Sequence, residues 1–215
     1  MGIRTIIFDW DGTLARTLDL WVEGYHAAFA KRGLRYSTEV VIAEFFHEHH
    51  KVAARHPGLD FHNVADEART HVRDGIGSVA LYEGAAQALG HVKAQGLSLA
   101  LVTSSPRRVV ERGLAAHDLT GAFASVIAGD DGFGHRPDTQ PFTETMARLQ
   151  TRSEETMVIG DSHVDILAGQ AAGCRTCWFA PQDNRLFHDF THLESLGADH
   201  RLGDWPGLMA ELSGP

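Results

Sequence analysis

The amino-acid sequence predicts an α/β fold: a parallel sheet covered by helices and interrupted near its start by an all-helical insertion. Three observations predict it. Short apolar runs rich in β-branched residues recur along the chain, amphipathic segments with helical spacing separate them, and one long early stretch has helical spacing but no strand. With 215 residues and 43% hydrophobic content, the chain suits one domain with a sizeable insertion better than two independent domains.

Five short apolar runs predict buried strands, and their lack of polar alternation is typical of parallel sheets covered on both faces. The amphipathic segments between the later strands have lengths that suit right-handed crossovers. The predicted strands are residues 5–8 (TIIF), 97–102 (LSLALV), 124–128 (ASVIA), 156–160 (TMVIG) and 175–179 (RTCWF), and helices are predicted over residues 107–117, 140–150 and 161–173.

The insertion carries apolar residues at helical spacing and breaks near Gly33 and Gly58. This spacing predicts helices within residues 20–33, 38–56 and 61–80. We therefore expect two parts: a core domain made of residues 1–17 and 80–215, and a helical domain made of residues 18–79.

Composition excludes several classes of partner. Acidic residues outnumber basic ones 28 to 19, for a formal net charge of −9, and no stripe of Lys and Arg is present to follow a phosphate backbone. We therefore expect no nucleic-acid partner. No apolar run approaches the roughly 18 residues that a membrane span needs, and Met1 leads directly into a predicted strand without a basic, apolar leader. The expectation is a cytoplasmic protein without a membrane partner.

Polar side chains that could bind a ligand or take part in catalysis follow four of the predicted strands. In parallel sheets of this kind, ligands bind in the crevice outside the carboxyl ends of the strands. We therefore expect these side chains to form one site. They are Asp9 and Asp11 after the first strand, Thr103 and Ser104 after the second, Arg136 in the loop after the third, and Asp161 and Asp165 after the fourth.

Asp9 and Asp11 flank Trp10, so in extended backbone the two carboxylates point to one side and the indole to the other. Carboxylates this close repel each other, and one of them takes up a proton unless a cation neutralises the pair. Two solutions follow: a divalent cation binds there, or the protonated carboxyl serves as an acid. Asp161 and Asp165 add oxygen ligands, and a set without Cys or His suits Mg²⁺.

The turn after these carboxylates adds a second feature. Gly12 and Thr13 are expected to form a turn whose backbone N–H groups face an anion.

Four motifs in this order resemble the haloacid dehalogenase (HAD) superfamily: DWDGT at residues 9–13, VTSSP at 102–106, HRPDTQPF at 135–142 and IGDSHVDILAGQAAG at 159–173. The likeness is greatest to its phosphatase branch with an α-helical cap, which contains the phosphoglycolate phosphatases and β-phosphoglucomutases. The resemblance covers nearly the whole chain, including a C-terminal segment similar to the family's last short strand and helix. It implies a Rossmann-like parallel sheet core with an inserted all-helical cap domain.

The resemblance also implies roles for single residues. Asp9 matches the nucleophile that forms an aspartyl phosphate, and Asp11 the general acid and base. Thr103 matches the hydroxyl that binds the phosphoryl group, helped by the N–H of Ser104. The resemblance implies that Mg²⁺ is held by Asp9, the backbone carbonyl of Asp11 and Asp161, with Asp165 as a second acidic position.

The sequence departs from the family pattern at two positions. Arg136 aligns with the usual lysine and keeps its charge, but a planar guanidinium does not substitute freely for a compact ammonium, so turnover is expected to be reduced. The alternative is a shifted register in which no cation reaches the site. Arg16 stands near the usual place of an acidic residue, and either faces an anionic substrate or lies in solvent.

The function that the resemblance implies is a Mg²⁺-dependent phosphatase similar to phosphoglycolate phosphatase, acting on a small phosphorylated metabolite as a monomer or homodimer. The cap would set substrate choice. A β-phosphoglucomutase-like phosphomutase remains an alternative, as does a weakly active protein that binds a phosphorylated metabolite. A dehalogenase is disfavoured, because its chemistry needs no acid at Asp11.

Two further patterns have simpler interpretations. Cys174 and Cys177 form a C-x-x-C pair, but no helix opens after it and no second pair completes a zinc site, so we expect two small residues in a strand. His47 and His50 have i, i+3 helical spacing in the histidine-rich insertion, which suits either a transition metal or a partly solvated helix face. Ser162 and His163 are expected to open a helix rather than touch substrate.

Overall fold

The computed structural model describes residues 2–46, 49–134 and 136–212, with side chains except at residues 49–50 and 209–212. The chain divides into two compact units, one made of residues 1–16 and 80–215 and the other of residues 17–79. These boundaries lie within one residue of those expected from the sequence. No helix in the described part of the chain is long and apolar enough to cross a membrane.

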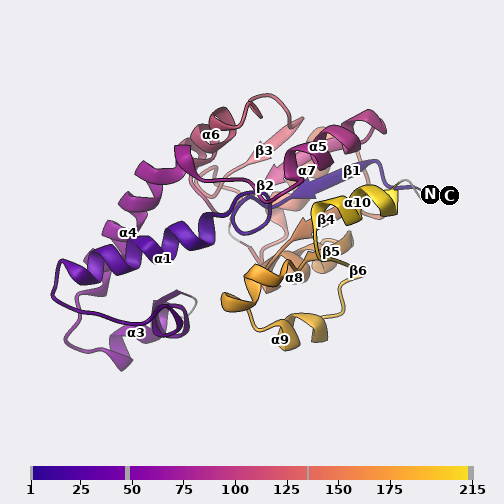
Figure 1. Ribbon diagram of the computed structural model, residues 1–215. Coiled ribbons are helices and arrows are strands. Elements are labelled where there is room, and N and C mark those ends of the chain that lie inside the picture. Colours follow the sequence, from indigo (N-terminus) through magenta and orange to yellow (C-terminus); the bar gives the residue numbers. More distant parts are fainter. Residues whose placement is uncertain (1, 47–48, 135, 213–215) are drawn as a thin grey trace. The chain divides into compact units, whose positions relative to one another are not determined.

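The first unit contains a parallel sheet, whose strands in the described residues are ordered β3-β2-β1-β4-β5-β6 (Figure 1). The α/β fold predicted from the sequence is confirmed, and the five predicted strands each agree to within one residue at either end. The strands are β1 (Thr5–Phe8), β2 (Ser98–Val102), β3 (Ser125–Ile127), β4 (Thr156–Gly160), β5 (Arg175–Phe179) and β6 (His200–Leu202).

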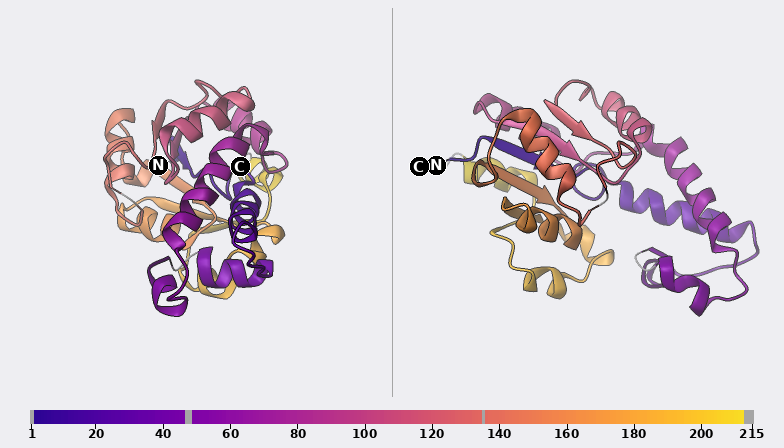
Figure 2. Two further views of the ribbon diagram at one scale, coloured as in Figure 1. Left: turned by 90° about the vertical axis from the view of Figure 1, so that its left-hand side faces the viewer. Right: turned by 180° about the vertical axis from the view of Figure 1, so that it is seen from behind.

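Helices cover both faces of this sheet (Figure 2). Strand residues alternate between the faces, so Ile7 joins α7 and α8 in one apolar cluster, whereas Phe8 on the other face lies against Trp205 of α10 with ring centroids 5.8 Å apart. The helices of this unit are α5 (Ala85–Ala94), α6 (Arg107–Ala116), α7 (Gln140–Leu149), α8 (His163–Ala171), α9 (Phe190–Ser195) and α10 (Trp205–Leu212).

The strand order indicates where on the sheet a ligand would bind. The chain moves outward from β1 to β2 and β3, then returns to the other side of β1 as β4. In open α/β sheets, ligands bind at the carboxyl ends of the two strands where the order reverses. Here these strands are β1 and β4, which end beside each other with Phe8 opposite Ile159. The residues that follow them are Asp9 and Asp161.

The regular secondary structure described in the second unit is entirely helical, with turns and irregular segments between the helices. Helices α1 and α4 pack closely, and a Cβ atom at Gly24 of α1 would lie 3.0 Å from the Ala68 carbonyl oxygen of α4. Phe45 fills the core of this unit, with ring centroids 4.7 Å from Phe29 and 5.9 Å from Phe61. The elements are α1 (Thr17–Ala30), α2 (Thr38–Val41), a π-helix (Ile42–Phe46), α3 (His49–Arg55), α4 (Phe61–Gly75) and a 3₁₀ turn (Ile76–Ser78).

Histidines of the second unit have ordinary partners where their side chains are described. His26 lies 3.2 Å from the Thr38 hydroxyl, and the His56 ring packs on Phe45 with centroids 4.8 Å apart. Among the described residues, this unit contains no cluster of metal-ligating side chains. His47 lies outside the described residues and the side chain of His50 is not described, so the hypothesis of a metal bound by these two remains a prediction.

Candidate active site

Three buried carboxylates meet at the carboxyl ends of β1 and β4. Asp9, Asp161 and Asp165 each offer an oxygen, and these three oxygens lie within 4.8 Å of one another. Asp9 directly follows β1, and its N–H still continues the sheet by donating to the Ile159 carbonyl at 3.0 Å. The sequence prediction that these residues share one site agrees with this geometry.

A glycine lets Asp165 approach the end of β4. A Cβ atom at Gly160 would lie only 2.2 Å from the Asp165 carboxyl carbon, a separation that no side chain tolerates. Ser162 begins α8 as expected: its hydroxyl donates to Asp165 Oδ2 at 2.6 Å and its N–H to the same oxygen at 3.2 Å, in a capping box. This first turn fixes the Asp165 carboxylate over the strand end.

Arg136 is the cation of the site. Its side chain is only 7% exposed, and its Nη1 lies 3.0 Å from Asp9 Oδ1 and also pairs with Asp165. Its Nη2 donates to the Ser104 hydroxyl at 3.2 Å. The register that aligns Arg136 with the family lysine therefore agrees with this geometry, and the shifted register without a cation does not.

The charged side chains of this acidic cluster shift one another's pKa values. Burial raises the pKa of Asp9 well above its ordinary value; Arg136 opposes this shift, while Asp165, Asp161 and Asp11 add to it. Burial would lower the pKa of Arg136, but Asp165 and Asp9 raise it above its ordinary value, so the guanidinium stays charged. Among the described residues, one guanidinium faces three carboxylates, so negative charge exceeds positive charge at this centre.

Asp11 is held by hydroxyl groups from the loop after β2. Its Oδ2 accepts hydrogen bonds from Ser105 Oγ at 2.7 Å and from Thr103 Oγ1 at 3.3 Å, and the Ser105 N–H donates to Thr103 Oγ1 at 3.1 Å. Thr103 was expected at the site, but Ser105 was not. The close approach of Gly129 supports this loop, since a Cβ atom there would lie 2.1 Å from the Ser104 carbonyl oxygen.

The turn after Asp11 uses its N–H groups internally. The N–H of Gly12 donates to the Ala15 carbonyl at 2.9 Å, and that of Thr13 to the Trp10 carbonyl at 3.4 Å. The expectation that these groups face an anion therefore has no support in this conformation. Thr13 instead reaches the centre through its hydroxyl, which donates to Asp161 Oδ1 at 3.2 Å.

The donor set fits a hard divalent cation. Three carboxylates supply only oxygen atoms, as Mg²⁺ prefers, and they have one guanidinium between them for charge balance. Asp11 Oδ1 is buried and accepts no hydrogen bond from the described residues. The Asp11 carboxylate lies outside the cluster of three, which agrees with the expectation that its backbone carbonyl is the ligand.

Comparison with known proteins identifies the family. The family model for haloacid dehalogenase-like hydrolases matches residues 6–179. This chain belongs to the haloacid dehalogenase-like hydrolases. Its likeness within the family is to the phosphatase branch with an α-helical cap, and it is an enzyme of the phosphatase type.

Individual relatives give finer comparisons. The pyrophosphatase PpaX of Anoxybacillus flavithermus is 32% identical over 207 residues, covering 84% of this chain and 85% of the relative. PpaX of Oceanobacillus iheyensis is 27% identical over 214 residues, covering 95% of this chain and 94% of the relative. The crystal structure of a predicted phosphoglycolate phosphatase from Haemophilus somnus has a TM-score of 0.82 and 19% identity, covering 98% of both chains, which supports the shared fold.

The sequence departures from the haloacid dehalogenase pattern have local partners. Arg16 donates to Asp183 at 2.8 Å, and its guanidinium lies 5.2 Å from the centroid of the Tyr82 ring. The Arg16 side chain is therefore engaged by Asp183 and Tyr82 in this structure, rather than by solvent alone or by a substrate anion.

Cys174 and Cys177 are buried thiols that belong to no disulfide; Cys177 lies in β5 as expected, whereas Cys174 directly precedes that strand. Burial, with a smaller contribution from Glu154, raises the pKa of Cys174 to about 11, which keeps this thiol protonated and unreactive.

Two residues that no motif signalled contact Asp161 of the acidic cluster. Asn184 and His188, in the segment after β5, both reach Asp161 Oδ2, at 3.3 and 2.7 Å. Burial would lower the pKa of His188, but Asp161 raises it above its ordinary value. Nothing in local spacing marks these two residues, because their partner lies more than 20 residues earlier in the chain.

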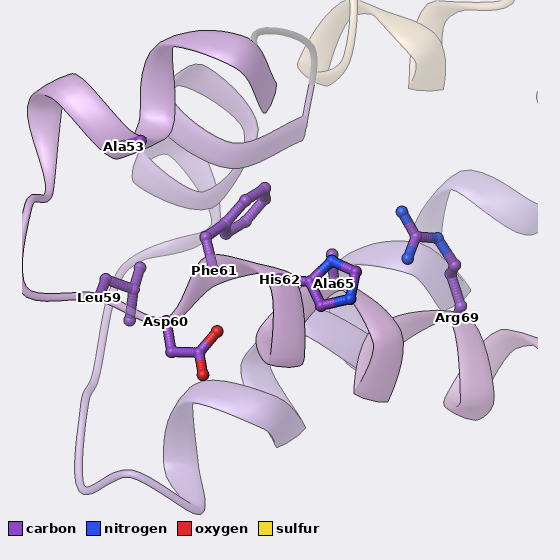
Figure 3. A pocket seen from close by; sticks show the side chains of 7 residues that line it. All are labelled: Ala53, Leu59, Asp60, Phe61, His62, Ala65 and Arg69. Carbon is purple, nitrogen blue, oxygen red and sulfur yellow. The ribbon is translucent and has the colours of Figure 1, made fainter.

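The second unit has its own hollow, of about 450 Å³, beside the start of α4 (Figure 3). Its polar residues already have partners: Asp60 caps α4 by accepting from the Asn63 N–H at 3.2 Å, and His62 and Arg69 both pair with Asp66. We assign this hollow no role in catalysis.

Proposed function

We propose that this enzyme is a Mg²⁺-dependent phosphatase that hydrolyses a small phosphorylated metabolite through an aspartyl phosphate on Asp9. The observation that carries the proposal is the pairing of two differently held carboxylates. Asp9 is buried in the acidic cluster under Arg136, whereas Asp11 is held by two hydroxyl groups and lies outside that cluster. Two carboxylates with separate environments suit a nucleophile and an acid–base partner.

In the first step, an Asp9 oxygen attacks phosphorus and the bond from phosphorus to the leaving oxygen breaks. Asp11 donates its proton to that oxygen as it leaves. In the second step, Asp11 removes a proton from water, the water oxygen attacks phosphorus, and the bond from phosphorus to Asp9 breaks to release inorganic phosphate. Asp11 ends protonated and Asp9 ionised, so the site returns to its starting state.

The other residues stabilise charge during these steps. Arg136 and the Ser104 hydroxyl would supply positive charge and a hydrogen bond for the phosphoryl oxygens, and the Thr103 hydroxyl would join them by turning away from Asp11. Asp9, Asp161 and the Asp11 carbonyl would hold Mg²⁺, with Asp165 beside them. When bound, Mg²⁺ neutralises the carboxylates and polarises the phosphoryl group.

The relatives suggest which substrates to test first. PpaX proteins are named pyrophosphatases, and the Haemophilus somnus structure is of a predicted phosphoglycolate phosphatase. Pyrophosphate and phosphoglycolate, the compounds in these two names, are both small and carry phosphate beside a second anionic group. We therefore infer a small, doubly anionic phosphorylated substrate, with inorganic pyrophosphate and phosphoglycolate as the leading candidates.

The test measures phosphate release from pyrophosphate, phosphoglycolate, β-glucose 1-phosphate, hexose 6-phosphates and nucleotides, with Mg²⁺ and with EDTA. We expect metal-dependent release from one or two compounds, and a loss of at least about 10³-fold in Asp9→Asn. The matched control is Asp74→Asn, which alters an exposed carboxylate of the helical unit. Glucose 6-phosphate formed from β-glucose 1-phosphate without free phosphate would support a phosphomutase instead, and activity retained by Asp9→Asn would exclude the aspartyl phosphate.

A further inference from the structure

Asp161 accepts hydrogen bonds from the side chains of three different residues, Thr13, Asn184 and His188. Its Oδ1 accepts one hydrogen bond, from the Thr13 hydroxyl at 3.2 Å. Its Oδ2 accepts from Asn184 Nδ2 at 3.3 Å and lies 2.7 Å from His188 Nε2. The two oxygens of the Asp161 carboxylate therefore accept different numbers of hydrogen bonds, one at Oδ1 and two at Oδ2.

His188 acts as a donor in this contact. An ionised carboxylate can only accept hydrogen bonds, so His188 Nε2 carries the hydrogen in either protonation state of the ring. The His188 side chain is only 8% exposed, which keeps competing water away from the bond. The contact thus orients Asp161 without depending on the charge of His188.

Asn184 is fixed from its other end. Its Oδ1 accepts a hydrogen bond from the Tyr82 hydroxyl at 2.5 Å, which sets the orientation of the amide, and its Nδ2 also donates to the Gly12 carbonyl at 2.9 Å. Asn184 therefore ties Asp161 to the turn that follows Asp11. All three of these side chain contacts are buried.

The number of lone-pair positions limits how many oxygens Asp161 can offer to a cation. Each carboxylate oxygen has about two lone-pair positions. His188 and Asn184 occupy both positions on Oδ2, whereas Thr13 occupies one on Oδ1. Only Oδ1 retains a free position, so Asp161 can offer a cation one oxygen rather than two.

We propose that His188 and Asn184 are positioning residues that restrict Asp161 to one ligand oxygen and thereby favour Mg²⁺ over Ca²⁺. Ca²⁺ accepts two oxygens of one carboxylate in a flexible shell, whereas Mg²⁺ demands a small, rigid set of single oxygens. Hydrogen-bond partners of metal ligands commonly change metal affinity by about 10- to 100-fold. The inference rests on the proposed function in that it takes Asp161 as a ligand of the catalytic cation.

The test measures binding of MgCl₂ alone and CaCl₂ alone to the substrate-free full-length protein by titration calorimetry. His188→Leu removes the donor, and His188→Asn keeps an amide that is too short to reach Asp161. His188→Gln can place an amide nitrogen near the position of Nε2 and serves as the rescue variant. His192→Leu, on an exposed position of α9, is the matched control.

We expect the Leu and Asn variants to weaken Mg²⁺ binding by about 10- to 100-fold and Ca²⁺ binding by less, which narrows the ratio of the two dissociation constants. Gln is expected to restore most of the Mg²⁺ affinity, and the control to match wild type. With substrate, kcat at limiting Mg²⁺ should fall in the Leu and Asn variants and recover at saturating Mg²⁺, with KM for substrate unchanged. Thermal unfolding in EDTA checks that each variant is folded.

The outcomes separate this inference from the proposed function. If wild type binds Mg²⁺ and releases phosphate, but a folded His188→Leu or His188→Asn variant has the wild-type dissociation constants for both ions, the positioning role is overturned and the phosphatase remains. If wild type neither binds Mg²⁺ nor releases phosphate, the proposed function fails and this inference fails with it.

Discussion

Replacing Gly160 with alanine tests how the acidic centre is placed. The added Cβ atom would lie 2.2 Å from the Asp165 carboxyl carbon and 2.4 Å from its Cβ. Reaching even 3.0 Å, below which real Cβ contacts are essentially absent, requires Asp165 to retreat by at least about 0.8 Å. That retreat changes the position of the carboxylate relative to its two partners, Arg136 and Ser162. Because a displacement near 1 Å costs on the order of 10²-fold in rate, we expect kcat to fall by about 10- to 100-fold.

The assay is phosphate release at saturating substrate and Mg²⁺, with thermal unfolding measured on the same preparation. Forcing an extra methyl group into this packed region should also lower the free energy of unfolding by about 1–3 kcal/mol. The matched control is Gly90→Ala in α5, where a Cβ atom meets nothing within 4 Å. This control should keep full activity and gain up to about 1 kcal/mol of stability, since alanine favours a helix.

A folded Gly160→Ala variant with kcat within threefold of wild type would refute this reasoning. It would mean that Asp165 either adjusts without cost or has no part in catalysis.

Three other predictions follow from the same geometry. Arg136→Met should lose about 10²- to 10³-fold in kcat, and Arg136→Lys should retain more, because an ammonium replaces the contacts to the carboxylates but not the one to Ser104; steady-state kinetics of both variants decides this. Asp131→Asn should lower the free energy of unfolding by about 1 kcal/mol at pH 7, because it weakens the pairing of Asp131 with Arg107. The hydrogen bond from Arg107 lowers the pKa of Asp131, so this pairing stabilises the fold above the ordinary aspartate pKa and its contribution is lost on acidification. In denaturant unfolding, the difference in stability between wild type and Asp131→Asn should be smaller at pH 3 than at pH 7. Cys177→Ala should leave activity unchanged under oxidising and reducing conditions, and redox-dependent activity in wild type alone would contradict this.

The sheet could be predicted from local sequence because its signal is local. A buried parallel strand needs a short run of apolar residues without polar interruption, and each of the five predicted runs satisfied this. The helices were harder. The predicted helix over residues 38–56 is divided into α2, a π-helix and α3 in the described residues, and apolar spacing does not record such a change of helical pitch. Helix α5 was not singled out, because alanines form much of its buried side and give a weak pattern.

The residues of the candidate site were predictable for a different reason. Asp9, Asp161 and Asp165 follow strand ends, and the carboxyl ends of parallel strands gather at one edge of the sheet. Any residue in that position is a candidate before the structure is known. Arg136 was also placed in this way, and its contacts with Asp9 and Asp165 favour the aligned register over the shifted one.

The partners of Asp161 obey the same topological rule, although no motif announces them. Asn184 and His188 belong to the segment that follows β5, and β5 lies next to β4 in the sheet. The loop after β5 must therefore start at the same edge as Asp161. What the sequence does not supply is which of the polar residues in this loop turn inward, because that depends on the Tyr82 hydroxyl, about 100 residues earlier, holding the Asn184 amide in place. The topology alone would therefore have made every polar residue of this loop a candidate partner of Asp161, without separating Asn184 and His188 from their neighbours.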